Sequence, residues 1–344
     1  MKNRQGGSTA RITIKHVASK AGVSLGTVSR VLNGNKSVGD ELRIRVERAI
    51  RELEYHPDVL AQSMRRGATR VVGVVIRSLM VPVLAGFVKA AQDVLHEAGY
   101  AVMLAGSEGR PERELEILSV LSRRRMDGVI MTTASEADPM LLRARQALQM
   151  PAVLLDRHNP TEFDAVLVAH REGIRRAVEH LLDLGHRRIA LITGEETTRP
   201  AVERVRGYHD AYRARGITPD PRFIRTQSFG ADFGFVETSS LMGQNPAPTA
   251  IIAGGIAMLP GVLRAARAHS LRVPDDLSII GSCDSDLAQM MTPPITVVQW
   301  DYEKVGKVAA ELLVGRIERE RDAAPRHVRF PAELVIRGSC AAPR

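Results

Sequence analysis

The first 55 residues carry apolar side chains at helical spacing in three short runs. In the first run, the apolar positions are Ile14, Val17, Ala18 and Ala21. In the second run, from Leu25 to Asn33, they are Val28, Val31 and Leu32. In the third run, which begins at about Asp40, they are Leu42, Val46, Ala49, Ile50 and Leu53. This pattern predicts three amphipathic helices whose apolar faces turn inward.

A tight turn is expected between the first two helices. Thr13 and Ser24 stand where N-caps belong, and Gly22 tolerates the positive φ of a helix end. The free face of the second helix is small and polar, and it consists of Leu25, Gly26, Ser29, Arg30 and Asn33. Such a unit is a helix-turn-helix whose second helix can enter a major groove. A plain αα-hairpin has the same spacing and is the alternative.

The charge of the chain favours the DNA-binding interpretation. The net charge is +9 over 344 residues. Residues 1–67 hold 13 Lys and Arg against 6 Asp and Glu, a net of +7, whereas the remainder holds 35 against 33, a net of +2. A positive head on a near-neutral body suits contact with phosphates by the head alone.

Two stretches, TIKHVASKAGVSLGTVSRVLNG (13–34) and LAQSMRRG (60–67), strongly resemble the lac repressor family of bacterial transcription regulators. The resemblance covers nearly the whole chain. It implies an N-terminal helix-turn-helix, a short hinge helix and an effector-binding core shaped like a periplasmic sugar-binding protein. One departure is His16, which stands where the family usually has an acidic residue near the start of the first helix. Because His16 cannot cap this helix as an anion, we expect the local stability to differ.

The helix-turn-helix pattern and the resemblance together define the expected DNA contacts. They are Thr13, Ser24, Leu25, Gly26, Thr27, Ser29, Arg30, Asn33, Leu60 and Met64. Arg30 can pair with guanine, Leu25 can touch a thymine methyl group, and Gly26 permits close approach. In the family, a leucine of the hinge helix enters the minor groove, and Met64 occupies the matching position here. Met64 packing against its own domain is the alternative.

The expected domain boundaries follow from these segments. Residues 1–57 form the DNA-binding headpiece, because Pro57 breaks the third helix. Residues 58–67 form a hinge helix and linker, too short to be stable without docking. Residues 68–344 form an effector-binding and dimerisation core.

From Val71 onward, short apolar runs alternate with amphipathic segments. The runs that predict strands are 71–76, 100–105, 128–132, 152–155, 189–193, 250–253 and 277–280. The segments that predict helices are 83–98, 112–123, 138–148, 171–184, 201–215, 231–243, 257–269 and 302–319. Apolar strands separated by helices indicate parallel sheets covered on both faces. A second set of units begins near residue 170, so we expect an α/β core of two Rossmann-like lobes, with ligand at the strand ends between them.

The effector residues can be compared with the family only one by one. Arg204, in the segment ERVRGY, keeps the position of an arginine that reaches the ligand, and Asp284 matches an acid of the turn after a late strand. Ile256 replaces the family's sugar-holding aspartate, His170 stands in place of one member of a D-N pair, and Trp300 replaces a glutamine. The loss of a carboxylate acceptor disfavours a neutral sugar. We therefore expect a more apolar or anionic effector, or none.

Other functional classes find little support in the sequence. We find no nucleotide-binding loop, nucleophile motif or metal-ligand spacing, and we expect neither a catalytic residue nor a cofactor nor a metal. The two cysteines, the polar N-terminus and the lack of a membrane-spanning run indicate a cytoplasmic protein. A solute-binding receptor and a cytoplasmic enzyme on doubly wound lobes are the alternatives.

The sequence therefore predicts a homodimeric transcription regulator, a repressor, that binds a near-palindromic double-stranded operator and responds to a small molecule. Activation is the alternative to repression, because the outcome depends on the position of the operator.

Overall fold

Three short helices build the amino-terminal part of the protein: α1 (Ile14–Ala21), α2 (Leu25–Leu32) and α3 (Asp40–Glu52). The computed structural model describes residues 12–32, 35, 37–55, 68–81, 84–157, 163–319 and 323–344. The three helices share a small core of Val17, Ala18, Ala21, Val28, Val46, Ala49 and Tyr55. The prediction that Leu42 lies inward is wrong, since Leu42 is 38% exposed and the buried face of α3 begins at Val46.

The turn between α1 and α2 has the expected glycine. Gly22 adopts φ 64° and ψ 41°, the left-handed conformation that suits glycine at a helix end. A guanidinium from α3 closes this turn, because Arg45 Nη2 donates to the carbonyl oxygen of Ala21 at 2.6 Å. A Cβ on Gly22 would lie only 2.8 Å from the same nitrogen. Gly22 thus serves both the backbone conformation and the packing of α3.

His16 caps the first helix in place of an acid. Its Nδ1 accepts the backbone N–H of Thr13 at 3.1 Å, which completes a capping box. The first turn of α1 contains no acidic residue. The imidazole Nδ1 therefore supplies the acceptor that a carboxylate would supply, but not the favourable interaction of a negative charge with the helix dipole.

We expect His16→Ala to destabilise α1 by about 0.5–1 kcal/mol, because the Thr13 N–H loses its acceptor. His16→Glu should match or exceed the native stability, because a carboxylate both accepts this hydrogen bond and suits the helix dipole. Amide hydrogen exchange of α1 in the full-length protein measures both effects. Lys15→Ala, an exposed change in the same turn, is the control. Equal protection in the native and His16→Ala proteins would contradict the cap.

The remainder forms a second compact unit, Arg70–Arg344, built on two six-stranded sheets. The first sheet has the order β11-β5-β4-β3-β1-β2. Its strands are β1 (Val71–Ile76), β2 (Ala101–Gly106), β3 (Gly128–Met131), β4 (Ala152–Leu155), β5 (Asp164–Val168) and β11 (His327–Phe330). Its helices are α5 (Leu84–Glu97), α6 (Pro111–Arg123), α7 (Pro139–Gln146) and, from the carboxyl-terminal region, α13 (Tyr302–Glu318).

The second sheet has the order β12-β10-β9-β8-β6-β7. Its strands are β6 (Ile189–Gly194), β7 (Ile224–Gln227), β8 (Ala250–Gly254), β9 (Ser278–Ser282), β10 (Thr296–Gln299) and β12 (Glu333–Val335). The helical segments of this lobe are α8 (His170–Asp183), α9 (Arg199–Ala214), η1 (Pro221–Phe223), α10 (Ala231–Met242), α11 (Leu259–Ala268) and α12 (Asp286–Met290). Only β10 and β12 pair antiparallel among the described strands.

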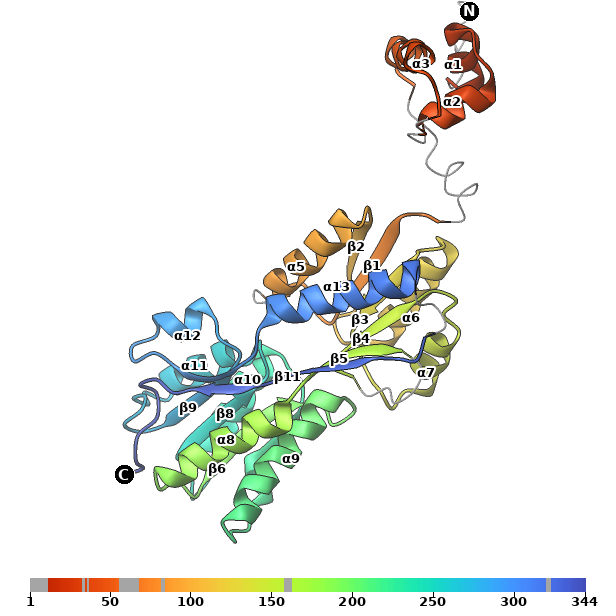
Figure 1. The fold of residues 1–344 in the computed structure, drawn as a ribbon. Helices are drawn as coiled ribbons and strands as arrows, with labels where there is room; N and C mark the ends of the chain where they lie inside the picture. Colours follow the sequence, from red (N-terminus) through yellow and green to blue (C-terminus); the bar gives the residue numbers. More distant parts are fainter. Residues whose placement is uncertain are drawn as a thin grey trace, which may run out of the picture. The chain divides into compact units, whose positions relative to one another are not determined.

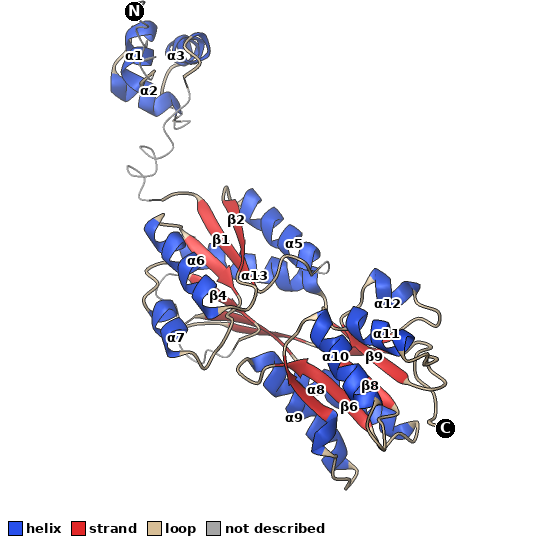
Figure 2. Ribbon diagram, turned by 180° about the vertical axis from the view of Figure 1, so that it is seen from behind, coloured by secondary structure: helices blue, strands red, loops and turns tan. Residues whose placement is uncertain are grey.

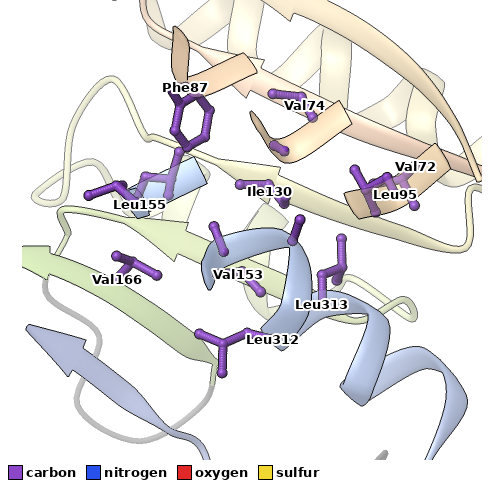
Figure 3. Close-up of a cluster of buried hydrophobic side chains, with 14 of the residues drawn as sticks. Val72, Val74, Phe87, Leu95, Ile130, Val153, Leu155, Val166, Leu312 and Leu313 are labelled. Atoms are coloured by element: carbon purple, nitrogen blue, oxygen red, sulfur yellow. The ribbon is translucent and has the colours of Figure 1, made fainter. Parts of the chain in front are cut away.

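Both faces of the first sheet are covered, as the continuous apolar strands predict. Figure 1 shows α5 and α13 side by side over one face. Between them and the sheet lie, among others, Val72, Val74, Phe87, Leu95, Ile130, Leu312 and Leu313, drawn in Figure 3. Helices α6 and α7 lie on the opposite face (Figure 2), where Val75 and Val129 pack with Leu118 and Leu121. Neighbouring residues of β1, Val74 and Val75, thus enter different cores.

The two lobes are not successive along the chain. The prediction of a second set of units from residue 170 onward is correct for β6 to β10, but α13 and β11 return to the first lobe. The chain then enters the second sheet again as β12. Three segments therefore join the lobes. The predicted fold class, a helical headpiece with an α/β core of two lobes, is confirmed.

None of the described helices combines the length and the apolar character that are needed to cross a membrane.

Candidate nucleic-acid interface and effector site

Helix α2 presents a small, largely polar surface while one side chain anchors it. Val28 is fully buried in the headpiece core, whereas Leu25, Gly26 and Arg30 are exposed. The Nε of Arg30 donates to the Gly26 carbonyl oxygen at 3.2 Å, which lays the side chain along the helix surface. This arrangement is the one that a recognition helix needs, because the inner face fixes the helix and the outer face stays open.

The start of α2 is held by its own polar side chains. Ser24 Oγ accepts the backbone N–H of Thr27 at 3.2 Å and lies 3.0 Å from the Thr27 hydroxyl. Ser24 is therefore an N-cap, as the sequence predicts, and Thr27 supports it.

Ser29 is half-buried on the same helix. Thr13, at the N-cap of α1, is exposed. Of the remaining predicted DNA contacts, Asn33, Leu60 and Met64 lie outside the described residues, as does the whole of the predicted hinge, 58–67.

In the Arg70–Arg344 unit, polar side chains gather where the lobes meet. Asp156 directly follows β4 of the first lobe, while His170, Arg199 and Arg204 come from α8 and α9 of the second. We call these four residues the interlobe cluster. Carboxyl ends of parallel strands are the usual place for ligands in such folds. Asp156 adopts a positive φ of 52°, an uncommon conformation that is often found at functional positions.

Asp156 and His170 form the centre of the interlobe cluster. Asp156 Oδ2 and His170 Nε2 are hydrogen-bonded, and the imidazole is 2% exposed. Burial lowers the pKa of His170 to about 4 despite the nearby carboxylate, so the ring is neutral near pH 7. The tautomer with hydrogen on Nε2 donates to Asp156 and leaves Nδ1 to accept from Arg204 Nη2 at 3.3 Å. Although burial opposes it, His170 and Arg199 hold the pKa of Asp156 below its usual value.

Arg199 ties the two lobes together. Its Nη1 donates to Asp156 Oδ1 at 2.5 Å and to the Val168 carbonyl oxygen at 3.1 Å. Glu136, in the loop after β3, donates its N–H to the Thr197 carbonyl oxygen at 2.8 Å, and its carboxylate accepts the Arg199 N–H. The start of α9 is therefore fixed to the first lobe through both backbone and side chain.

Aromatic rings line the second-lobe side of the interlobe cluster. The Trp300 ring meets the His170 ring edge-on at 4.9 Å and lies 5.1 Å from the ring of Tyr302. The Arg204 guanidinium lies 5.6 Å from the centre of the Phe229 ring. Three of the five predicted effector residues, Arg204, His170 and Trp300, thus meet in one place. The site combines cationic donors with aromatic surface.

The other two predicted effector residues have different surroundings. The Asp284 carboxylate accepts two bonds from Arg337, at 2.6 and 2.8 Å, and one from Gln289 at 2.9 Å. The Arg337 hydrogen bonds lower its pKa. Ile256, which follows β8, is half-buried and adds only apolar surface. A role of either residue in effector binding remains a prediction.

Sequence reasoning missed several residues of the site. Asp156 directly follows a predicted strand, so its position at a strand end was a usable signal. Arg199 lies two residues before the predicted start of its helix. Phe229 lies in a loop between β7 and α10, where no periodic pattern marks it. Tyr302 is the first residue of α13 and lies two residues after Trp300, where no motif of the sequence marks it.

Comparison with known proteins identifies the family. Residues 13–58 match the model for bacterial regulatory proteins of the lacI family, and residues 178–340 match a periplasmic binding protein-like domain. The chain is 31% identical over 332 residues to the HTH-type transcriptional regulator DegA of Bacillus subtilis, covering 96% of this chain and 98% of the relative. It is 33% identical over 307 residues to the ribose operon repressor of Escherichia coli K12, covering 89% and 93%.

The chain belongs to the lacI family. The predicted function, a DNA-binding transcription repressor with an effector-binding core, is thereby confirmed, and the receptor and enzyme alternatives are not favoured.

Solved structures of related regulators share the architecture. A lac repressor dimer bound to operator and the anti-inducer ONPF matches with a TM-score of 0.82 and 28% identity, covering 96% of this chain and 99% of that one. A complex of the transcriptional regulator CelR with cellobiose matches with a TM-score of 0.70 and 31% identity, covering 96% and 100%.

Proposed function

We propose that this lacI-family protein represses transcription by placing α2 in the major groove of an operator. The observation that carries the proposal is the contrast on this helix between the fully buried Val28 and the exposed Leu25, Gly26 and Arg30. Base contacts come from Leu25 and Arg30, while Thr13, Ser24, Thr27 and Ser29 lie beside them and approach the phosphates. The excess of positive charge in residues 1–67 attracts the DNA backbone.

The protein acts as a homodimer on a near-palindromic operator. The related lac repressor was solved as a dimer bound to operator. A two-fold symmetric dimer reads two half-sites, so its operator mirrors that symmetry. Asn33, Leu60 and Met64 remain further proposed DNA contacts, with Met64 as the wedge of the hinge helix. We place this activity in the cytoplasm, where the DNA of a bacterial regulator lies, and we assign the chain no enzymatic reaction.

A small molecule bound at the interlobe cluster controls the repressor. Arg204, His170 and Trp300 converge there from three separate segments, at the junction of two lobes whose relative position such a ligand can change. CelR, a related regulator, was solved with cellobiose. The control requires the ligand to prefer one of two states of the core, and DNA binding then changes by the same coupling free energy.

Replacement of Arg30 tests the DNA-contact assignment. We expect Arg30→Ala to reduce discrimination at one base pair of each half-site by about 1–3 kcal/mol, because the guanidinium is a bidentate partner for guanine. Binding to a panel of operators that differ at single base pairs measures this change. Arg51→Ala, an exposed arginine on α3, is the matched control and should weaken all the operators alike. The same base preferences in native and Arg30→Ala proteins would contradict the assignment.

A further inference from the structure

Arg204 is a buried cation whose guanidinium has no direct carboxylate partner among the described residues. The residue is 3% exposed, and its Nε has no hydrogen-bond partner. Its one side-chain hydrogen bond, from Nη2, goes to the neutral His170, and no carboxylate oxygen of the described residues lies within 4.0 Å of the guanidinium. Burial lowers the pKa of Arg204 to about 10, so it stays charged near pH 7. An uncompensated buried charge is unfavourable, and an anion would relieve it.

Asp156, the carboxylate that acts electrostatically on Arg204, is already used. Asp156 Oδ1 accepts from Arg199 and from the Val168 N–H, and Oδ2 is bonded to His170. Arg204 therefore keeps an unused N–H donor, and the interlobe cluster, as the structure describes it, has no free carboxylate, so a ligand bound to Arg204 has to bring acceptors.

A second guanidinium reaches the same place from the other lobe. Arg77 directly follows β1, and its guanidinium carbon lies 5.4 Å from the centre of the Phe229 ring, which Arg204 also covers. Burial lowers the pKa of Arg77, although Glu195 and Glu108 oppose this effect. The Phe229 ring packs so closely on Gly194 and Gly255 that a Cβ on these glycines would lie 2.1 and 3.0 Å from it. One aromatic ring thus stands beside two cations of opposite lobes.

We propose that the effector is an oxyanion, a carboxylate or phosphate group on an apolar or planar body, and that its anionic group binds Arg204 and Arg77. The inference rests on the proposed function, that a small molecule bound at the interlobe cluster controls the repressor. The guanidinium Nε and Nη of Arg204 supply paired donors to the oxyanion, and Arg77 adds the second charge. Phe229 and Trp300 contact the body of the ligand. Because the two arginines belong to different lobes, the bound anion draws the lobes together.

The only tryptophan of the chain reports on this site. Trp300 lies beside His170 and Tyr302, so its fluorescence follows binding directly in the full-length protein. The probes are D-gluconate and D-glucose 6-phosphate against D-glucose, and benzoate against benzyl alcohol. We expect the anions to change the fluorescence and to raise the melting temperature, and their neutral counterparts to do neither. The gluconate and glucose 6-phosphate arms separate a carboxylate ligand from a phosphate ligand.

Arg204→Met should weaken binding of the responding anion by about 10- to 100-fold, the value of a hydrogen bond to a charged group. Because the change removes an unpaired buried charge, the ligand-free protein should melt no lower than the native one. Arg213→Ala, an exposed arginine of the same helix, is the matched control and should leave binding unchanged. No response to any of the anions, or equal binding of a neutral probe by native and Arg204→Met proteins, would overturn the inference.

Operator release, measured in the same samples, separates this inference from the proposed function. A neutral probe that binds beside Trp300 and releases operator would contradict the anionic ligand while supporting control through this site. An anion that binds through Arg204 but leaves operator affinity unchanged would support the anion site and contradict the control.

Discussion

Removal of residues 1–67 is expected to abolish specific operator binding while the two-lobed core stays folded. Most of the net charge, +7 of +9, lies in these residues, and the exposed face of α2 lies there too. Specific binding by such proteins exceeds non-specific binding by about 10³-fold or more, so we expect a loss of that order. Fluorescence anisotropy with a labelled operator measures the loss.

The core should survive this deletion, because its apolar clusters are separate from the headpiece cluster. Val17, Val28 and Val46 belong to the headpiece cluster, whereas the clusters of the two lobes are made by residues from the strands and helices of the Arg70–Arg344 unit. Circular dichroism and the melting temperature of the shortened chain provide the control. A folded core that still bound the operator within tenfold of the full-length protein would refute the assignment of DNA binding to the headpiece.

The second large effect is expected in the free energy of unfolding, when Asp164 at the start of β5 is replaced by alanine. Its side chain is fully buried and accepts two hydrogen bonds from Arg316 of α13, at 2.7 and 3.0 Å. The backbone N–H of Arg326 donates to the same carboxylate at 2.7 Å. Asp164 of β5 is thus bonded to α13, 152 residues later, and to the segment before β11, 162 residues later. Asp164→Ala takes from the buried Arg316 guanidinium the carboxylate that accepts two of its hydrogen bonds, and we expect a loss of about 3–5 kcal/mol in the free energy of unfolding.

Urea-induced unfolding of the core measures this loss. The double variant Asp164→Ala with Arg316→Met should recover part of the stability, because it removes the buried guanidinium together with the carboxylate that accepted its hydrogen bonds. Asp183→Ala, which breaks the exposed pair with Arg215, is the control and should cost less than about 1 kcal/mol. If Asp164→Ala were no more harmful than Asp183→Ala, the account of β5 and α13 would be wrong.

The sequence was informative where local pattern decides the structure. The predicted helix 171–184 differs from α8 by one residue at each end, and the predicted helix 302–319 differs from α13 by one residue at its carboxyl end only. Both segments carry a continuous apolar stripe. The strands that the sequence did not predict, β5, β7, β10, β11 and β12, are short and carry no comparable apolar pattern. β5 begins with a charged residue, and β11, with the sequence HVRF, is partly exposed. The return of α13 to the first lobe depends on its packing against α5, which no local pattern encodes.

The same distinction applies to the candidate site. Arg204, His170 and Trp300 could be predicted because each occupies a position that the family resemblance marks. Arg199 could not, since its partner Asp156 lies 43 residues earlier and no spacing relates the two. The orphan Nε of Arg204 is likewise invisible in the sequence, because it reflects the absence of a partner among side chains brought together only by folding.

Selection of DNA by the full-length protein from a random duplex library, followed by titration of the selected duplex and a scrambled duplex of equal length, tests the central claim most directly. The account predicts a near-palindromic consensus that binds about 10³-fold or more tightly than the scrambled duplex, with affinity that falls steeply as salt rises. Failure to enrich a consensus, with equal affinity for both duplexes, would contradict it.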